Sequence, residues 1–218
     1  MSVSRFKKYA DHFGADYIFQ TKPVYSPESS FYEKLRIIYD TEFDKYDEIL
    51  YTDVDVIPEV FDKSIFDENV FEVGLIREKP YPNMTNTPYH STPVIQEEYK
   101  SLSERHKKSM QMDGDKYVVY NTGVMLWTRL GIIKARQNFM NWRPYFGDSN
   151  VVKGMNLDQP FINLNLKDAH LNITELPIQY NCFPRPSWVE GHFPKDVVFT
   201  HYTGGKKKYI IETYKIRK

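Results

Sequence analysis

The 218-residue sequence contains a single cysteine, Cys182, so the chain cannot form an internal disulfide or a cysteine-based metal site. This scarcity of cysteine favours a reducing, cytoplasmic setting. Positive and negative side chains number 29 each, so the net charge of zero gives no reason to expect a broad surface for nucleic acid or for a membrane. No hydrophobic run reaches the roughly 18 residues that a membrane span needs, and we predict no transmembrane segment.

The length and the aromatic content of the chain are more informative. A chain of this size can bury the core of one large α/β domain, and we expect residues 1–218 to form a single catalytic domain, alone or as one piece of a larger enzyme. Aromatic residues make up 16% of the chain, and 17 of them are tyrosines. This composition fits a sugar-binding surface and a tyrosine-rich core equally well.

The segment "EILYTDVDVIP" (residues 48–58) places two acids at the end of an apolar run that reads as a buried strand. Residues two apart in a strand point to the same side, so we expect Asp53 and Asp55 to project together where the strand leaves the sheet. Carboxylates held close together in apolar surroundings repel each other, and a divalent cation removes that repulsion. Oxygen ligands suit Mg²⁺ or Mn²⁺. Two solvated acids in a surface turn are the simpler alternative.

Alternating strand and helix patterns predict an α/β fold with a mainly parallel sheet. Hydrophobic spacing and breaker residues predict these elements in chain order: a helix over 2–13 that ends at Gly14, a strand over 16–20, a helix over 31–43, strands over 48–52 and 71–78, a strand interrupted at Asn-Thr-Gly over 116–129, a helical segment over 130–146, a helix that opens at Asp158, and a strand near 196–202. Residues 79–115 are long, polar and proline-containing, which is typical of a lid or binding loop, with a helix expected around 95–110.

The Asp-Val-Asp-Val-Ile run also resembles the first motif of haloacid-dehalogenase-type phosphatases, in which the first aspartate is a nucleophile. That resemblance implies a Mg²⁺-dependent phosphatase. The motif in such enzymes lies on the first strand, whereas here it follows an earlier predicted strand. The late segment "KDVVFT" also lacks the acidic pair that would complete the metal site.

Four further motifs follow the paired aspartates in the order "YNTGVMLW", "NLDQPFINL", "LPIQYN" and "HYTGGKKK". Together with the run from "FYEKLRIIYD" to "YTDVDVIP", this series resembles the GT-A-fold retaining glycosyltransferases over residues 31–208. The pattern is similar to the family that includes glycogenin and the bacterial lipopolysaccharide galactosyltransferases (family 8), and to the related galactosyl/xylosyl family (family 34). The resemblance implies a GT-A, Rossmann-like fold: one mainly parallel central sheet flanked by helices in a single domain.

The resemblance also implies a metal site. In such glycosyltransferases the two motif acids and a late histidine hold Mn²⁺ (or Mg²⁺), which binds the diphosphate of a nucleotide sugar. The corresponding ligands in this sequence are Asp53, Asp55 and His201. Two carboxylates and a neutral imidazole leave positions open for phosphate oxygens. Taken alone, His201 reads more simply as a core or surface histidine.

The remaining implied site residues bind the donor or take part in catalysis. Donor-binding roles fall to Lys34, Asp53, Asn121, Gly123, Gly204 and Lys207, and catalytic roles fall to Asp158, Gln159 and Lys207. In the resembled enzymes the Asp of the Asp-Gln pair hydrogen-bonds sugar hydroxyls, the Gln lies near the anomeric carbon, and the late Lys places a cation beside the leaving phosphate. The sequence continues with Lys-Tyr after Lys207, where these families often have Pro-Trp.

Several of these residues have simpler structural interpretations. Asp158 fits the N-cap of a helix, and Lys34 fits a solvated helix position. Asn121 and Gly123 fit a turn or bulge between strands, and Lys207 fits a solvated basic turn.

The implied activity is transfer of a hexose from a nucleoside-diphosphate sugar to an acceptor hydroxyl with retention of configuration. A UDP-sugar is the donor expected from the resemblance, and the acceptor would be a glycan, a glycolipid or a glycoprotein that contacts residues 79–115. A nucleotide-sugar-binding domain without catalysis is the other alternative. Folds of this type usually begin with a base-binding strand, whereas this sequence begins with a helical pattern, so the sequence does not identify the base.

Overall fold

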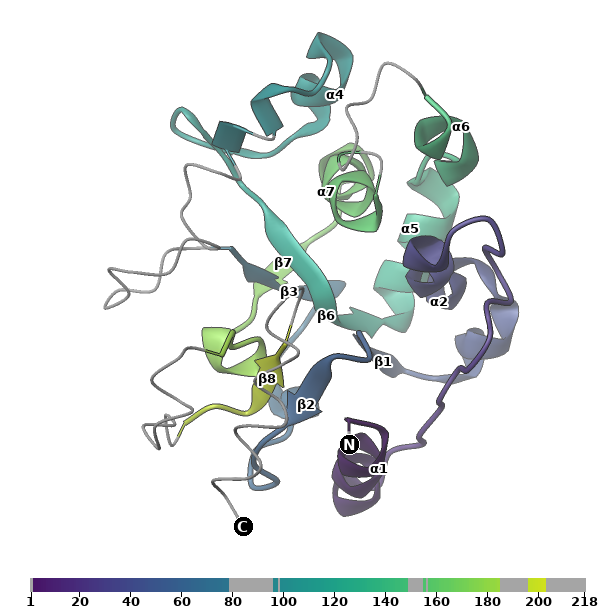
Figure 1. The fold of residues 1–218 in the computed structure, drawn as a ribbon, viewed down its shortest axis with the longest axis vertical. Coiled ribbons are helices and arrows are strands. Elements are labelled where there is room, and N and C mark those ends of the chain that lie inside the picture. Colours follow the sequence, from purple (N-terminus) through teal and green to yellow (C-terminus); the bar gives the residue numbers. More distant parts are fainter. Residues whose placement is uncertain are drawn as a thin grey trace.

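The computed structural model describes residues 2–78, 96–97, 99–148, 155, 157–184 and 196–202. A four-stranded sheet with the order β1-β6-β3-β7 forms the centre of these residues (Figure 1). Its strands are β1 (Glu48–Thr52), β6 (Tyr120–Thr128), β3 (Val73–Arg77) and β7 (Ile173–Glu175). The α/β class and the central sheet flanked by helices are therefore confirmed, and the pairs β2–β8 and β4–β5 form two further small sheets.

The direction of β6 corrects the prediction of a mainly parallel sheet. β6 pairs antiparallel with β1 and with β3, and the only parallel pairing in this sheet among the described residues is that of β3 with β7. Thus β1, β3 and β7 run in one direction, and β6 lies reversed between two of them. A strand buried on both faces has the same hydrophobic run in either direction, so its composition did not reveal the reversal.

The two faces of the sheet pack against different elements, as the alternation of side chains along β6 requires. Met125 and Trp127 lie in one core with residues of α2 (Arg36–Tyr39), α5 (Arg129–Asn138) and α7 (Asp158–Asp168). Val124 and Leu126 lie in a second core with residues of α1 (Ser2–Phe13), β2 (Val56–Pro58) and β8 (Phe199–His201). The sheet is therefore covered by α2, α5 and α7 on one face, and by α1 and the β2–β8 pair on the other (Figure 1).

The other described elements are short. They are the 3₁₀ helices η1 (Ser30–Leu35), η2 (Thr41–Lys45), η3 (Ile65–Asp67) and η4 (Ile178–Tyr180), the helices α4 (Glu104–Ser109) and α6 (Trp142–Phe146), and the hairpin strands β4 (Met112–Asp113) and β5 (Lys116–Tyr117). No helix within the described ranges is both long enough and apolar enough to span a bilayer.

Several predicted elements are confirmed and others are wrong. The helix over 2–13 forms, and Gly14 ends it with a φ of +67°, a conformation that favours glycine. The expected strand over 16–20 does not form, since no described segment pairs with it. The single helix expected over 31–43 is divided into η1, α2 and η2.

The Asn-Thr-Gly segment interrupts strand pairing without ending the strand. β6 is continuous through it, but the register with β3 shifts between Leu75 and Ile76, whose partners are Met125 and Asn121. Of the helix expected around 95–110, the structure shows α4; residues 79–95 of the proposed lid lie outside the described residues.

Candidate functional site

The paired aspartates lie in the turn that joins β1 to β2. The backbone N–H of Asp53 donates to the Gly123 carbonyl at 2.8 Å, which fixes this end of β1 against β6. The N–H of Val56 donates to the Asp53 carbonyl at 3.0 Å and closes the turn. The intervening Val54 is 68% exposed, so the turn directs its apolar residue outward and leaves the two acids beside the sheet.

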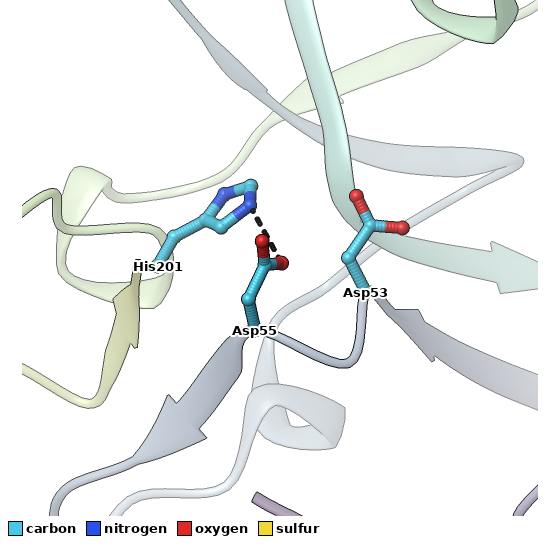
Figure 2. A group of neighbouring side chains, drawn as sticks. All are labelled: Asp53, Asp55 and His201. Carbon is cyan, nitrogen blue, oxygen red and sulfur yellow. Dashed lines mark ion pairs between the residues drawn. The ribbon is translucent and has the colours of Figure 1, made fainter. Parts of the chain in front are cut away.

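A histidine distant in sequence completes this cluster, because β8 pairs with β2 and sets His201 opposite Val56. Asp53, Asp55 and His201 each offer a ligand atom, and these atoms all lie within 4.8 Å of one another. The His201 Nε2 atom is 3.3 Å from Asp55 Oδ1, and Figure 2 shows these two side chains facing each other with Asp53 beside them. The structure therefore brings together the three residues that the resemblance assigned to metal binding.

Two neighbours pack closely against the His201 ring. Phe183 stacks on it at 5.1 Å between ring centroids. A Cβ atom built on Gly123 would be only 2.2 Å from His201 Cε1. The absence of a side chain at Gly123 is thus what admits the imidazole, a structural requirement that sequence reasoning did not assign to this glycine.

Lys34 is not a solvated helix residue, since its side chain is only 5% exposed. Its Nζ atom lies 2.6 Å from Asp158 Oδ2 and 3.2 Å from Asp53 Oδ1, and it donates to the Thr122 carbonyl at 3.1 Å. Burial alone would lower the pKa of Lys34, but the charges of Asp53 and Asp158 outweigh that effect and raise it above its ordinary value. The buried ammonium therefore stays charged and links the two acids.

Asp158 does not cap helix α7. The N-cap position belongs to Leu157, and Asp158 is the first helical residue. Its carboxylate accepts from the Thr122 hydroxyl at 3.0 Å and pairs with Lys34, so the N-cap interpretation of Asp158 is wrong. An acid in the first turn is also favoured by the helix dipole.

Tyr51 orients Asp53. The Tyr51 hydroxyl donates to Asp53 Oδ1 at 3.0 Å. Burial, followed by the negative charge of Asp53, raises the pKa of Tyr51 above its ordinary value, so the hydroxyl keeps its proton and acts as a donor.

Asn121, Gln159 and Glu78 form an amide–carboxylate network next to the cluster of Asp53, Asp55 and His201. Asn121 Nδ2 donates to Glu78 Oε1 at 2.9 Å and to Gln159 Oε1 at 3.3 Å. Gln159 Nε2 donates to Glu78 Oε1 at 3.1 Å. Asn121 Oδ1 accepts from the Gly123 N–H at 2.9 Å and from Asn181 Nδ2 at 2.8 Å. Since Asn121 is buried and its amide is fully hydrogen-bonded, it acts within the protein in this structure, and its predicted contact with a sugar stays a prediction.

Sequence reasoning missed four residues that shape this site: Tyr51, Glu78, Thr122 and Asn181. Glu78 carried a usable signal, because it is an acid at the end of the strand predicted over residues 71–78. Thr122 and Asn181 lay within motifs that were recognised, but no property of either residue alone indicated its partner.

A cavity of about 1290 Å³ opens onto this cluster. Its lining includes residues of α1 and β1 and residues 14–23, and also Lys34, Asp53, Asp55, Asn121, Asp158 and His201. The remaining predicted residues, Gly204 and Lys207, lie outside the described residues.

No protein-family model and no curated protein matches this sequence. Solved structures do match it. A glycosyltransferase involved in glycosylation of the major capsid of PBCV-1 aligns with 100% of this chain and 91% of its own, at 13% identity and a TM-score of 0.52. Mouse xyloside xylosyltransferase 1 aligns with 93% of this chain and 71% of its own, at 14% identity and a TM-score of 0.51.

The galactosyltransferase LgtC, solved with donor and acceptor sugar analogs, aligns with 95% of this chain and 72% of its own, at 16% identity and a TM-score of 0.47. That TM-score is too low to support an argument. The two matches above 0.5 show that this chain has the fold of the GT-A glycosyltransferases.

Proposed function

We propose that this chain, with its GT-A glycosyltransferase fold, is a metal-dependent enzyme that transfers a hexose from a nucleoside-diphosphate sugar to an acceptor hydroxyl with retention. The observation that carries the proposal is that Asp53, Asp55 and His201 come together in the lining of the cavity, beside the buried Lys34. A UDP-sugar is the proposed donor, and a glycan, glycolipid or glycoprotein is the proposed acceptor.

The three residues fit a divalent cation. Two carboxylates and one imidazole are a donor set that suits Mn²⁺ or Mg²⁺, and all three can reach one ion with modest movements because their ligand atoms lie within 4.8 Å. His201 Nε2 already faces a carboxylate oxygen, an arrangement that a shared cation would stabilise. When bound, the ion would act as a Lewis acid that stabilises the negative charge of the departing nucleoside diphosphate.

The chain's own residues would orient the donor. Lys34 holds Asp53 and Asp158 in fixed positions, and Asp158 would keep its second oxygen for a sugar hydroxyl. The Gln159 amide is oriented by Glu78 and Asn121 at the first turn of α7, where the resembled enzymes have the glutamine near the anomeric carbon. Fixed groups of this kind lower the entropic cost of aligning the reacting atoms.

The reaction exchanges two bonds at the anomeric carbon. The bond to the phosphate oxygen breaks, the bond to the acceptor oxygen forms on the same face, and the acceptor proton passes to the leaving phosphate. Asp158 and Glu78 already bond neighbouring ammonium or amide groups, which favours positioning over attack on the sugar. Lys207 is proposed to stabilise the leaving group, and Gly204 to let the backbone approach the phosphates.

The two alternatives have less support. A haloacid-dehalogenase-type site needs a late acidic pair, whereas the third candidate ligand near Asp53 and Asp55 is a histidine. A binding domain without catalysis would show nucleotide binding but no transfer. The cytoplasmic setting stays a prediction.

The proposal is tested by incubating the protein with UDP-glucose, UDP-galactose or UDP-xylose and Mn²⁺, and measuring UDP release and sugar transfer. We expect turnover that stops when EDTA is added and in the Asp55→Ala variant. Asp47→Asn is a matched control, because Asp47 is 92% exposed and pairs with Arg129 outside the site. Full activity of Asp55→Ala would refute the metal assignment, and release of phosphate from phosphomonoesters instead would support the phosphatase.

A further inference from the structure

We propose that Asn181 is a positioning residue that keeps a proton on Nδ1 of His201, so that Nε2 alone serves as the metal-binding nitrogen. The inference rests on the proposed function for its consequence, metal affinity, but the position of the proton can be measured without any metal. Asn181 is fully buried, and its Oδ1 atom lies 2.9 Å from His201 Nδ1.

The orientation of the Asn121 side-chain amide follows from its neighbours, because a backbone N–H can only donate a hydrogen bond and a carboxylate can only accept one. The Gly123 N–H can only donate, and it meets Asn121 Oδ1 at 2.9 Å. At the other side of this amide, Nδ2 lies 2.9 Å from the carboxylate of Glu78, which favours a donor at that position. Both contacts require the same orientation of Asn121, with its oxygen toward Gly123.

The orientation of Asn121 then determines that of Asn181. Since Asn121 presents an oxygen, the atom of Asn181 that lies 2.8 Å from it must be the NH₂ group. The carbonyl oxygen of Asn181 therefore faces the imidazole, and it accepts a hydrogen bond only if Nδ1 of His201 is protonated. These hydrogen bonds form a chain, here called the relay. It runs from the Gly123 N–H and the Glu78 carboxylate through Asn121 and Asn181 to Nδ1 of His201.

The competing acceptor explains why the relay matters. Asp55 Oδ1 lies 3.3 Å from Nε2, and a carboxylate there would attract a proton to the nitrogen that must be bare to bind a metal (Figure 2). Without Asn181, a neutral ring would place its only proton on Nε2, toward Asp55. With Asn181 present, the carbonyl oxygen that faces Nδ1 favours the tautomer with its proton on Nδ1. Partners of this kind behind a ligating histidine commonly fix its tautomer and raise metal affinity.

The first test is a long-range ¹H–¹⁵N NMR spectrum of the metal-free wild-type protein. The chain has six histidines, and a His201→Gln variant identifies the signals of His201 by their loss. We expect the Nδ1 shift of a protonated nitrogen at neutral and at alkaline pH. A neutral ring with a bare Nδ1 and a protonated Nε2 would overturn the proposal, and this measurement needs no asparagine variant to fold.

The second test compares two variants at position 181 by NMR and by Mn²⁺ titration followed with electron paramagnetic resonance. Asn181→Leu removes the acceptor, so we expect the proton on Nε2 and a loss of Mn²⁺ affinity of about 10–100-fold. Asn181→Asp keeps an acceptor at Nδ1 in either protonation state, so we expect it to retain the wild-type tautomer and most of the affinity. Asn165→Leu is the control, because Asn165 is equally buried but bonds Phe161 and Met140 away from the site.

Unchanged tautomer and affinity in Asn181→Leu would refute the role of Asn181. The same loss of affinity in Asn165→Leu would also refute it, because the effect would then be a general one of removing a buried amide. A protonated Nδ1 in a protein that shows no sugar transfer would leave the relay intact and reject only the glycosyltransferase.

Discussion

Replacing Lys34 with methionine tests the electrostatic centre of the site. The substitution keeps the volume of the side chain but removes the ammonium that lies 2.6 Å from Asp158 and 3.2 Å from Asp53. Removing one partner of a buried ion pair typically costs about 3–5 kcal/mol, because the remaining charge is left unpaired. The Asp53 side chain is 31% exposed and gains some screening from water, so we expect the low end of this range, about 3 kcal/mol.

The assay is urea denaturation at neutral pH, with a thermal melt as a second readout. For a chain of this size, a loss of about 3 kcal/mol corresponds to a decrease in Tm of about 6–12 °C. Lys100→Met is the matched control, because Lys100 is 60% exposed and its ion pair with Glu97 is on the surface. Such pairs contribute about 0–1 kcal/mol. Equal effects of Lys34→Met and Lys100→Met would refute the reasoning.

A double variant and the pH dependence sharpen this prediction. Adding Asp158→Asn to Lys34→Met removes one of the two carboxylates that Lys34→Met leaves without a partner. The loss of unfolding free energy in the double variant should therefore be smaller than the sum of the two single losses by more than about 0.5 kcal/mol.

The pKa of Lys34 is raised above its ordinary value of 10.5, so its stabilising contribution is fully present below that pH and is lost only above it. The stability difference between wild type and Lys34→Met should therefore be constant between about pH 7 and 9; a steady decline over this interval would contradict the raised pKa.

Three further substitutions test separate parts of the site. Gly123→Ala places a Cβ atom 2.2 Å from His201 Cε1, so we expect the Mn²⁺ affinity measured by calorimetry to fall at least about tenfold. Gly147→Ala is the control, because its Cβ would meet nothing closer than 3.6 Å, and it should leave the Mn²⁺ affinity unchanged. Tyr51→Phe removes the hydrogen bond to Asp53, so urea denaturation should show a loss of about 0.5–1.5 kcal/mol, and a stabilised variant would contradict the donor role. Lys207→Ala should lower kcat for donor turnover about 10²–10³-fold with little change in Mn²⁺ affinity, and an unchanged kcat would remove this residue from the proposed mechanism.

The local signals along the chain predicted the elements that position the site better than they predicted the topology. The strand over 48–52 and the helix that opens at Asp158 formed as expected, because each has a strong hydrophobic pattern and clear boundaries. The strand over 16–20 failed because a strand depends on a partner for its backbone hydrogen bonds, and short-range patterns do not show whether a partner exists.

The grouping of Asp53, Asp55 and His201 was predictable only in part from the residues themselves. The Asp-x-Asp after an apolar strand indicates a cation site by its own chemistry. His201 joins it through the pairing of β2 with β8, a long-range contact that only the resemblance to known motifs suggested. Asn181 and Thr122 act through specific side-chain orientations in the folded protein, which composition and spacing do not encode.

The central claim is that one divalent ion, bound by Asp53, Asp55 and His201, holds the diphosphate of the donor. Isothermal titration of UDP into the wild-type protein, with Mn²⁺ and with EDTA, tests it most directly. We predict UDP binding that requires Mn²⁺ and disappears in Asp55→Ala and in His201→Ala. Equal binding of UDP in the presence of Mn²⁺ and of EDTA, unaltered by either substitution, would contradict it.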